Sequence, residues 1–201
     1  MIKAAIFDIG GVLLRWTNLP MFEDMDQTLR IPEEIRKEAW TKLSPPFEVG
    51  KIKEPEFWQE FTKMTQAEGE LPQESLIQRE FKKRFTLDTD VVAIAHRLKE
   101  NGLKLGIISN TIDPHAEILR NSNLFDSFDF VILSNEVGLR KPDSEIYELA
   151  LAKSGVKSDE AFFVDDLPKN IEGAEKVGIH GIQFVNKDQL LSEIKKLGVE
   201  I

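Results

Sequence analysis

The stretch AAIFDIGGVLL, residues 4–14, places an apolar run directly before an aspartate and a pair of glycines. A continuous apolar run of this kind predicts a strand that is buried on both faces, as in a parallel sheet. Asp8 ends the predicted strand over residues 3–8, where an unpaired charge is costly. We therefore expect a strand that delivers an acidic group to the edge of a sheet.

Four further apolar runs predict buried strands over residues 103–109, 129–134, 161–165 and 180–185. Helix-like stretches follow these runs, two of them opened by proline and closed by glycine. They span residues 113–121, 144–155, 168–178 and 187–198. Because strands and helices alternate with short connections, the sequence predicts an α/β fold with a parallel sheet covered by helices on both faces.

The segment between the first strand and a predicted helix over 90–102 is long and poor in strand-like runs. Its prolines and its Glu, Lys, Phe, Trp and Leu content favour helices over a structureless loop. We expect four helices, over residues 20–29, 33–43, 54–65 and 73–84. The predicted organisation is a core of residues 1–15 and 86–201 with a helical cap, residues 16–85, inserted after the first strand.

Polar side chains follow the predicted strands at their carboxyl ends, where open parallel sheets bind ligands. They are Asp8, Ser109, Asn110, Lys141, Asp165 and Asp166. Three clustered carboxylates repel one another unless a cation compensates them, and Mg²⁺ suits an all-oxygen site. Lys141 is placed to bridge Asp8 and a phosphoryl oxygen. Asp8 is either a metal ligand or a nucleophile, although a strand-end aspartate is also a common helix cap.

Composition excludes several functional classes. The 35 acidic and 26 basic residues give a net charge of −9, which disfavours nucleic acid and anionic membranes as partners. The chain has no cysteine, no apolar run of the roughly 18 residues that span a membrane, and no apparent signal peptide, so we expect a cytoplasmic protein. Isolated histidines make a zinc site improbable, although His115 follows the second strand closely.

The segments FDIGGVLL, IISNT, GLRKPD and FFVDDLPKNIEGA, in this order, resemble the four motifs of the haloacid dehalogenase-like (HAD) hydrolase superfamily. The similarity spans the chain and is greatest to a bacterial sugar-phosphatase subgroup that includes an enzyme acting on glucose 1-phosphate. It implies a Rossmann-like, doubly wound core with a cap domain. It also implies a Mg²⁺-dependent phosphatase that forms an aspartyl-phosphate on a small phosphorylated substrate, with a sugar phosphate as the expected one.

The resemblance assigns roles by position in the motifs. Asp8 corresponds to the nucleophile, and Lys141 to the catalytic lysine, which also contacts phosphate. The remaining phosphate-binding positions are Ser109, Asn110, Gly10 and Gly11. The metal-binding positions are Asp8, the backbone carbonyl of Gly10, Asp166, and in some relatives Asp165 and Asn170.

Gly10 departs from the usual pattern, because phosphatases of this superfamily carry there a second aspartate that acts as general acid and base. A general acid or base contributes about 10²–10⁴-fold to the rate. Two alternatives therefore remain open: a metal-free 2-haloacid dehalogenase, and a weak or non-catalytic binding protein of the same fold. The sequence also leaves open whether the chain is a monomer or a homodimer, and whether Arg15 and Trp16 contact the substrate.

Overall fold

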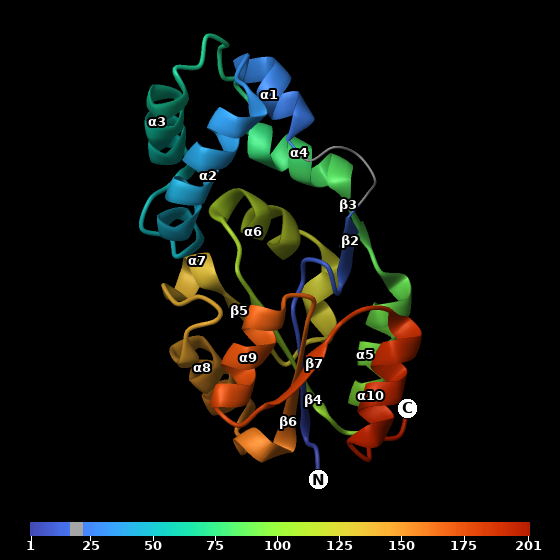
Figure 1. The fold of residues 1–201 in the computed structure, drawn as a ribbon. Coiled ribbons are helices and arrows are strands. Elements are labelled where there is room, and N and C mark those ends of the chain that lie inside the picture. Colours follow the sequence, from blue (N-terminus) through green and yellow to red (C-terminus); the bar gives the residue numbers. More distant parts are fainter. Residues whose placement is uncertain (17–21) are drawn as a thin grey trace.

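The computed structural model describes residues 1–16 and 22–201, and Figure 1 shows a sheet-based core with a helical layer on one end of it. The sheet has five parallel strands in the order β5-β4-β1-β6-β7. Their bounds are Ala4–Phe7 for β1, Lys104–Ser109 for β4, Phe130–Leu133 for β5, Ala161–Asp165 for β6 and His180–Gln183 for β7. These strands confirm the five that the apolar runs predict, and β1 lies at the centre because both its faces are buried.

Helices cover both faces of this sheet, which confirms the predicted α/β class. One face packs against α5 (Thr89–Glu100), α6 (Asp113–Arg120) and α10 (Lys187–Lys196) through a large apolar cluster. The other face packs against α8 (Ser144–Ser154) and α9 (Pro168–Lys176), where Ile146 and Ala174 are fully buried. Two sheet faces of continuous Ile, Val, Leu and Phe need this double cover, since either face left in water would expose its apolar area.

Register in the sheet sets which side chains meet at its edge. Phe7 pairs with Ile107 of β4 and with Val164 of β6, so β1 and β6 end side by side. The Asp8 N–H donates to the carbonyl of Val164 at 2.9 Å, which carries this pairing one residue beyond the strand. Asp8 and Asp165 therefore stand next to each other at the carboxyl end of the sheet.

Four helices form the layer above that edge: α1 (Glu23–Leu29), α2 (Glu33–Glu48), α3 (Glu54–Thr65) and α4 (Leu76–Arg84). They enclose an apolar core of their own, in which Phe47, Phe57 and Phe61 are fully buried. Two short strands, β2 (Leu14–Trp16) and β3 (Phe85–Leu87), pair antiparallel and join this layer to the sheet. The predicted domain boundaries stay a prediction, and both fall on this two-stranded connection.

The structure corrects one predicted helix end. The prolines at 45 and 46 predict a helix that stops at residue 43, whereas α2 continues through both prolines to Glu48. Proline inside a helix removes a backbone donor and crowds the preceding turn. Here the last turn carries Phe47 into the cap core, where it stacks on Phe57 at 4.8 Å between ring centroids. Burial of this ring offsets the lost hydrogen bonds.

Three smaller elements complete the described chain: α7 (Ser134–Val137) and the 3₁₀ helices η1 (Asn123–Ser127) and η2 (Ser158–Glu160). Within the part of the chain that the structure describes, we find no helix of the length and apolarity that crossing a bilayer requires.

Candidate active site

Three carboxylates gather where β1 and β6 end. One oxygen each of Asp8, Asp165 and Asp166 lies within 4.8 Å of the other two. Asp8 and Asp165 are buried and Asp166 is half-buried. This is the convergence that the strand ends predict, and it concentrates negative charge in a region that water reaches poorly.

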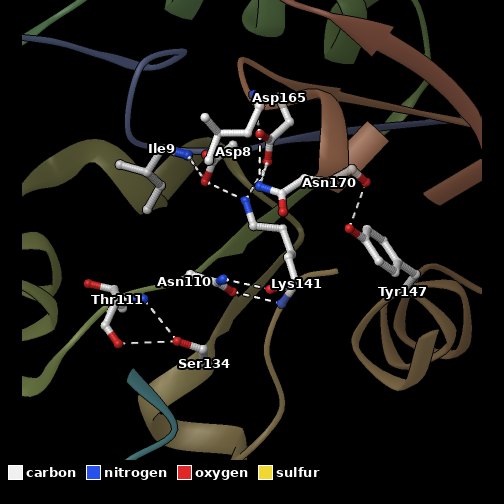
Figure 2. Close-up of polar contacts among 10 residues, drawn as sticks. Asp8, Ile9, Asn110, Thr111, Ser134, Lys141, Tyr147, Asp165 and Asn170 are labelled. Carbon is white, nitrogen blue, oxygen red and sulfur yellow. Dashed lines mark hydrogen bonds and ion pairs between the residues drawn. The ribbon is translucent and has the colours of Figure 1, made fainter. Parts of the chain in front are cut away.

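Lys141 is the cation of this cluster. Its Nζ lies 2.8 Å from Asp8 Oδ1 and 2.6 Å from Asp165 Oδ2, and the side chain is only 1% exposed (Figure 2). Burial by itself would lower the pKa of Lys141, but the two carboxylates outweigh it and raise that pKa. Lys141 therefore stays charged and links β1 to β6 through a buried ion pair.

Asn110, directly after β4, positions the backbone of Lys141. Its Nδ2 donates to the Lys141 carbonyl at 2.9 Å, and its Oδ1 accepts the Lys141 N–H at 2.8 Å (Figure 2). Both ends of this side chain thus contact the Lys141 backbone, and the contact with phosphate that the resemblance implies stays a prediction. The sequence shows Asn110 as a neighbour of Ser109, but not that it holds the Lys141 loop.

Asp165 is fixed from several sides. Beyond Lys141, it accepts hydrogen bonds at 3.0 Å from Asn170 Nδ2 on both of its oxygens, and at 2.9 Å from the Leu167 N–H. The backbone carbonyl of Asn170 accepts in turn from the Tyr147 hydroxyl at 2.7 Å (Figure 2). The amide nitrogen of Asn170 donates to Asp165, while its Oδ1 is buried without a hydrogen-bond partner among the described residues, so its part as a metal ligand stays a prediction. Sequence reasoning missed Tyr147, whose role depends on how α8 meets α9.

Asp8 differs from Asp165 in having one oxygen in use and one available. Oδ1 accepts from the Ile9 N–H at 2.7 Å and from Lys141, whereas Oδ2 has no hydrogen-bond partner among the described residues. Burial raises the pKa of Asp8 to about 7, with Lys141 lowering it and Asp165 raising it further. Asp8 is therefore only partly ionised at neutral pH. Additional positive charge nearby would lower its pKa and favour the carboxylate.

The two glycines after Asp8 have different surroundings. Gly11 has a positive φ of 79°, and a Cβ at this position would lie 2.5 Å from Asp166 Oδ2. Gly10 lies outside the left-handed region and has no atom within 4 Å of the place a Cβ would take. Gly11 is thus required by the approach of Asp166, while Gly10 leaves open space next to Asp8.

A pocket of about 170 Å³ adjoins this cluster between the sheet edge and the cap. Ser109 and Gly10 line it on the core side, together with the half-buried His115. Glu48, Asn110 and Thr111 add further polar groups to its lining. The other walls are apolar, formed by Ile9, Leu14, Trp40, Phe81, Phe85, Ile112 and Leu119. The polar end of this pocket can take an anionic group, and its apolar walls can take the group attached to it.

Arg15 does not join the cluster, because its guanidinium pairs with Asp88 and its side chain is 59% exposed. The side chain of Trp16 lies outside the described residues. His115 stacks on Phe81 at 4.3 Å between ring centroids, and burial lowers its pKa to about 3. His115 is therefore neutral and belongs to the packing of α4 on α6 as well as to the pocket wall.

The donor set fits a hard divalent cation. Asp8 and Asp166 each have a raised pKa, caused first by burial and in part by Asp165, and a cation would restore the charged form of both. The oxygens of Asp165 already accept from Lys141, Asn170 and Leu167. The carboxylates of Asp8 and Asp166 are accordingly the groups best placed to hold Mg²⁺.

The fold and the cluster define a Rossmann-like α/β protein with an acidic centre at the edge of the sheet. The family profile of haloacid dehalogenase-like hydrolases matches residues 2–178, and the chain belongs to that family. Among curated proteins it resembles a sesquiterpene phosphatase of Aspergillus oryzae, with 29% identity over 97% of this chain and 96% of that protein.

Solved structures agree on the fold. A HAD family enzyme of Bacteroides thetaiotaomicron, in complex with magnesium and inorganic phosphate, superposes with a TM-score of 0.76, 23% identity, and coverage of 90% of this chain and 93% of that one. A 2-haloacid dehalogenase of Pseudomonas syringae superposes with a TM-score of 0.62 and 21% identity, over 92% and 86% of the two chains. The likeness to both shows the architecture of the chain.

Proposed function

We propose that this protein is a Mg²⁺-dependent phosphatase that hydrolyses a small phosphorylated metabolite through an aspartyl-phosphate on Asp8. The observation that carries the proposal is the buried Lys141, held at 2.8 Å from Asp8 with Asp166 beside them. A nucleophile, a fixed cation and a metal-binding pair of carboxylates are what phosphoryl transfer needs, since its catalysis rests on positioning and on charge stabilisation.

The contacts of Asp8 define its part in the reaction. Because Ile9 and Lys141 hold Oδ1, Oδ2 is the oxygen that attacks phosphorus. The bond from Oδ2 to phosphorus forms as the ester bond breaks, and the leaving oxygen takes up a proton from water. A second water then attacks phosphorus, which releases phosphate and regenerates Asp8.

Lys141, Ser109 and the backbone around Gly10 and Gly11 surround the transferred group in this proposal. Lys141 neutralises phosphoryl oxygen charge as it builds up, and its ion pair with Asp165 keeps the ammonium in place. Asp8, Asp166 and the carbonyl of Gly10 would hold Mg²⁺, which when bound supplies further positive charge at the phosphoryl oxygens. Asp165 and Asn110 act by positioning Lys141.

The relatives support a phosphatase at the level of reaction class. The Aspergillus relative is a phosphatase, and its similarity to this chain covers nearly its full length. The structure of the Bacteroides enzyme contains magnesium together with inorganic phosphate. A sugar phosphate, which the resemblance implies, stays a prediction. The pocket beyond Ser109 is walled mostly by apolar side chains, which favours a less polar leaving group than a sugar.

The experiment measures phosphate release from p-nitrophenyl phosphate by wild type, D8N and D188N, each with excess Mg²⁺ or with EDTA. We expect D8N and EDTA each to lower kcat by at least about 10³-fold, because one removes the nucleophile and the other the metal charge. D188N removes an exposed carboxylate of α10 and should retain wild-type activity.

Two results would contradict the proposal. Wild-type turnover by D8N would exclude the aspartyl-phosphate. Activity that survives EDTA, together with chloride release from 2-chloropropionate, would instead establish the metal-free dehalogenase. The three carboxylates weigh against that alternative, because without a cation the cluster keeps a buried excess of negative charge.

A further inference from the structure

A cavity lies outside the site above, on the flank of the molecule between α4, α5 and α6. It has a volume of about 510 Å³, within the roughly 300–1,000 Å³ of small-molecule sites. The pocket beside Asp8 has about 170 Å³, which is below that range. A ligand of ordinary size that binds at Asp8 would therefore have to extend beyond the pocket.

The flank cavity and the catalytic pocket share a wall. Leu14, Phe81, Phe85 and Leu119 line both of them. Leu14 and Phe85 come from the two strands that join cap to core, Phe81 from α4 and Leu119 from α6. The two cavities thus adjoin across these four apolar side chains.

The lining of the flank cavity is apolar inside and polar at its rim. Val92, Ile118 and Leu124 are half-buried and pack against the main core. Lys82, His96 and Asn123 are exposed at its margin, and the cavity has no carboxylate in its lining. Such a surface binds an apolar chain well, but offers few partners to the hydroxyls of a sugar.

We propose that the flank cavity is the subsite for the apolar tail of the substrate, so that the protein acts on phosphate monoesters of long-chain hydrophobic alcohols. This proposal rests on the phosphatase function above and names its substrate class. The phosphate sits at Asp8, Lys141 and Ser109, and the chain runs along Leu14, Phe81, Phe85 and Leu119 into the flank cavity. Because the flank cavity shares four lining side chains with the pocket beside Asp8, a substrate tail is favoured over a separate partner.

The first test is a chain-length series of alkyl monophosphates, from butyl to decyl, assayed with Mg²⁺ below their critical micelle concentrations. Each methylene moved from water into an apolar site should raise kcat/KM by about fourfold until the cavity is full. We expect decyl phosphate to exceed butyl phosphate at least about hundredfold, and to exceed glucose 1-phosphate similarly. A flat length profile would overturn the proposal.

The second test alters the cavity. L124W fills it, and V92T keeps its shape while adding a hydroxyl. Both should reduce the decyl-to-butyl ratio of kcat/KM, L124W at least about tenfold and V92T by about threefold. The matched control is V185W, which adds a tryptophan at a residue that is 68% exposed and outside the cavity; its ratio should equal that of wild type. An unchanged ratio in folded L124W and V92T would overturn the proposal.

Two further outcomes separate this inference from its alternatives. If wild type is a dimer that L124W dissociates, and no length preference exists, a second copy covers the cavity and the proposal is wrong. If wild type fails to hydrolyse any phosphate, the phosphatase function falls, and calorimetry with alkylphosphonates decides the tail subsite independently. Decylphosphonate that binds at least about hundredfold more tightly than butylphosphonate would still support the subsite, whereas equal affinities would exclude it.

Discussion

At the scale of single residues, the pair Gly10-Gly11 separates a structural requirement from a chemical one. Gly11 adopts a positive φ, and Asp166 Oδ2 lies 2.5 Å from where its Cβ would be, so any side chain here displaces a carboxylate of the cluster. Gly10 has neither constraint. The missing acid at position 10 is therefore not dictated by the backbone, and the space beside Asp8 remains part of the pocket that receives the substrate.

This difference predicts a large effect for G11A and a small one for G10A. In G11A, a left-handed conformation strained for alanine should lower the free energy of unfolding by about 1 kcal/mol or more. The displaced Asp166 should also raise the Mg²⁺ concentration for half-maximal activity about 10–100-fold. G10A should change both quantities little. Urea unfolding and Mg²⁺ titration of phosphatase activity check this, and similar Mg²⁺ requirements in the two variants would exclude Asp166 as a metal ligand.

At the scale of elements, the contact of α4 with α6 depends on an uncharged histidine. His115 of α6 stacks on Phe81 of α4 with an interplanar angle of 29°. Burial lowers the pKa of His115 from 6.5 to about 3, so the unfolded chain binds a proton more readily than the folded one between these values. The contribution of His115 to the free energy of unfolding is therefore complete above pH 6.5 and is lost as the pH falls toward 3.

The corresponding prediction compares wild type with H115F, which keeps an aromatic ring but cannot titrate. Below pH 6.5, wild type should lose stability relative to H115F by up to about 1.4 kcal/mol per pH unit, the value for one proton. Urea unfolding at pH 7.5, 6.5 and 5.5 measures this difference. A constant difference between the two proteins across these pH values would show that His115 already takes up a proton in the folded state.

Elements also show what the sequence can and cannot predict. Strands such as β1 and β6 were predictable because burial on both faces leaves a continuous apolar run, a signal contained in the strand itself. The end of α2 was not, because the stacking of Phe47 on Phe57 outweighs two prolines. The three-residue strands β2 and β3 are too short for any period to appear in them.

The same distinction holds in the candidate site. Asp8, Lys141, Asp165 and Asp166 could be brought together from the sequence, since parallel strands end at one edge. The part of Asn110 as a clamp on Lys141 could not, because it depends on a loop conformation 31 residues away along the chain. Likewise, the bond from Tyr147 to Asn170 requires knowing how α8 lies against α9.

At the scale of the whole molecule, the cap meets the core through the end of α2. The Glu48 carbonyl accepts from the Ser134 hydroxyl at 2.6 Å, and the Glu48 carboxylate lies 2.9 Å from Arg140 Nη2. Gly50 lies against the Asn135 carbonyl, where a Cβ would come within 2.3 Å. Arg140 immediately precedes Lys141, so the contact that holds the cap down adjoins the loop that carries the catalytic lysine.

This arrangement predicts that the Glu48–Arg140 pair stabilises the closed cap. Burial raises the pKa of Glu48 and Arg140 opposes it, so removing the guanidinium leaves a desolvated carboxylate. R140A should destabilise closure by about 1.4 kcal/mol and lower kcat/KM about tenfold. R120A is the matched control. Arg120 pairs with Glu136 on the surface of the sheet-based core and, among the described residues, has no ion pair with the cap, so R120A should change kcat/KM little.

Because R140A could also disturb Lys141 directly, the decisive measurement is a double-mutant cycle with E48A, which breaks the same contact from the cap side. If the pair acts through closure, R140A and E48A should each lower kcat/KM about tenfold, and the double variant should lower it little further. Additive losses would mean that each residue acts separately, Arg140 through the Lys141 loop. Glu48 and Arg140 are 23% and 27% exposed and are thus largely shielded from solvent ions. Added salt should therefore weaken their ion pair, and the loss of kcat/KM on its removal, only slightly.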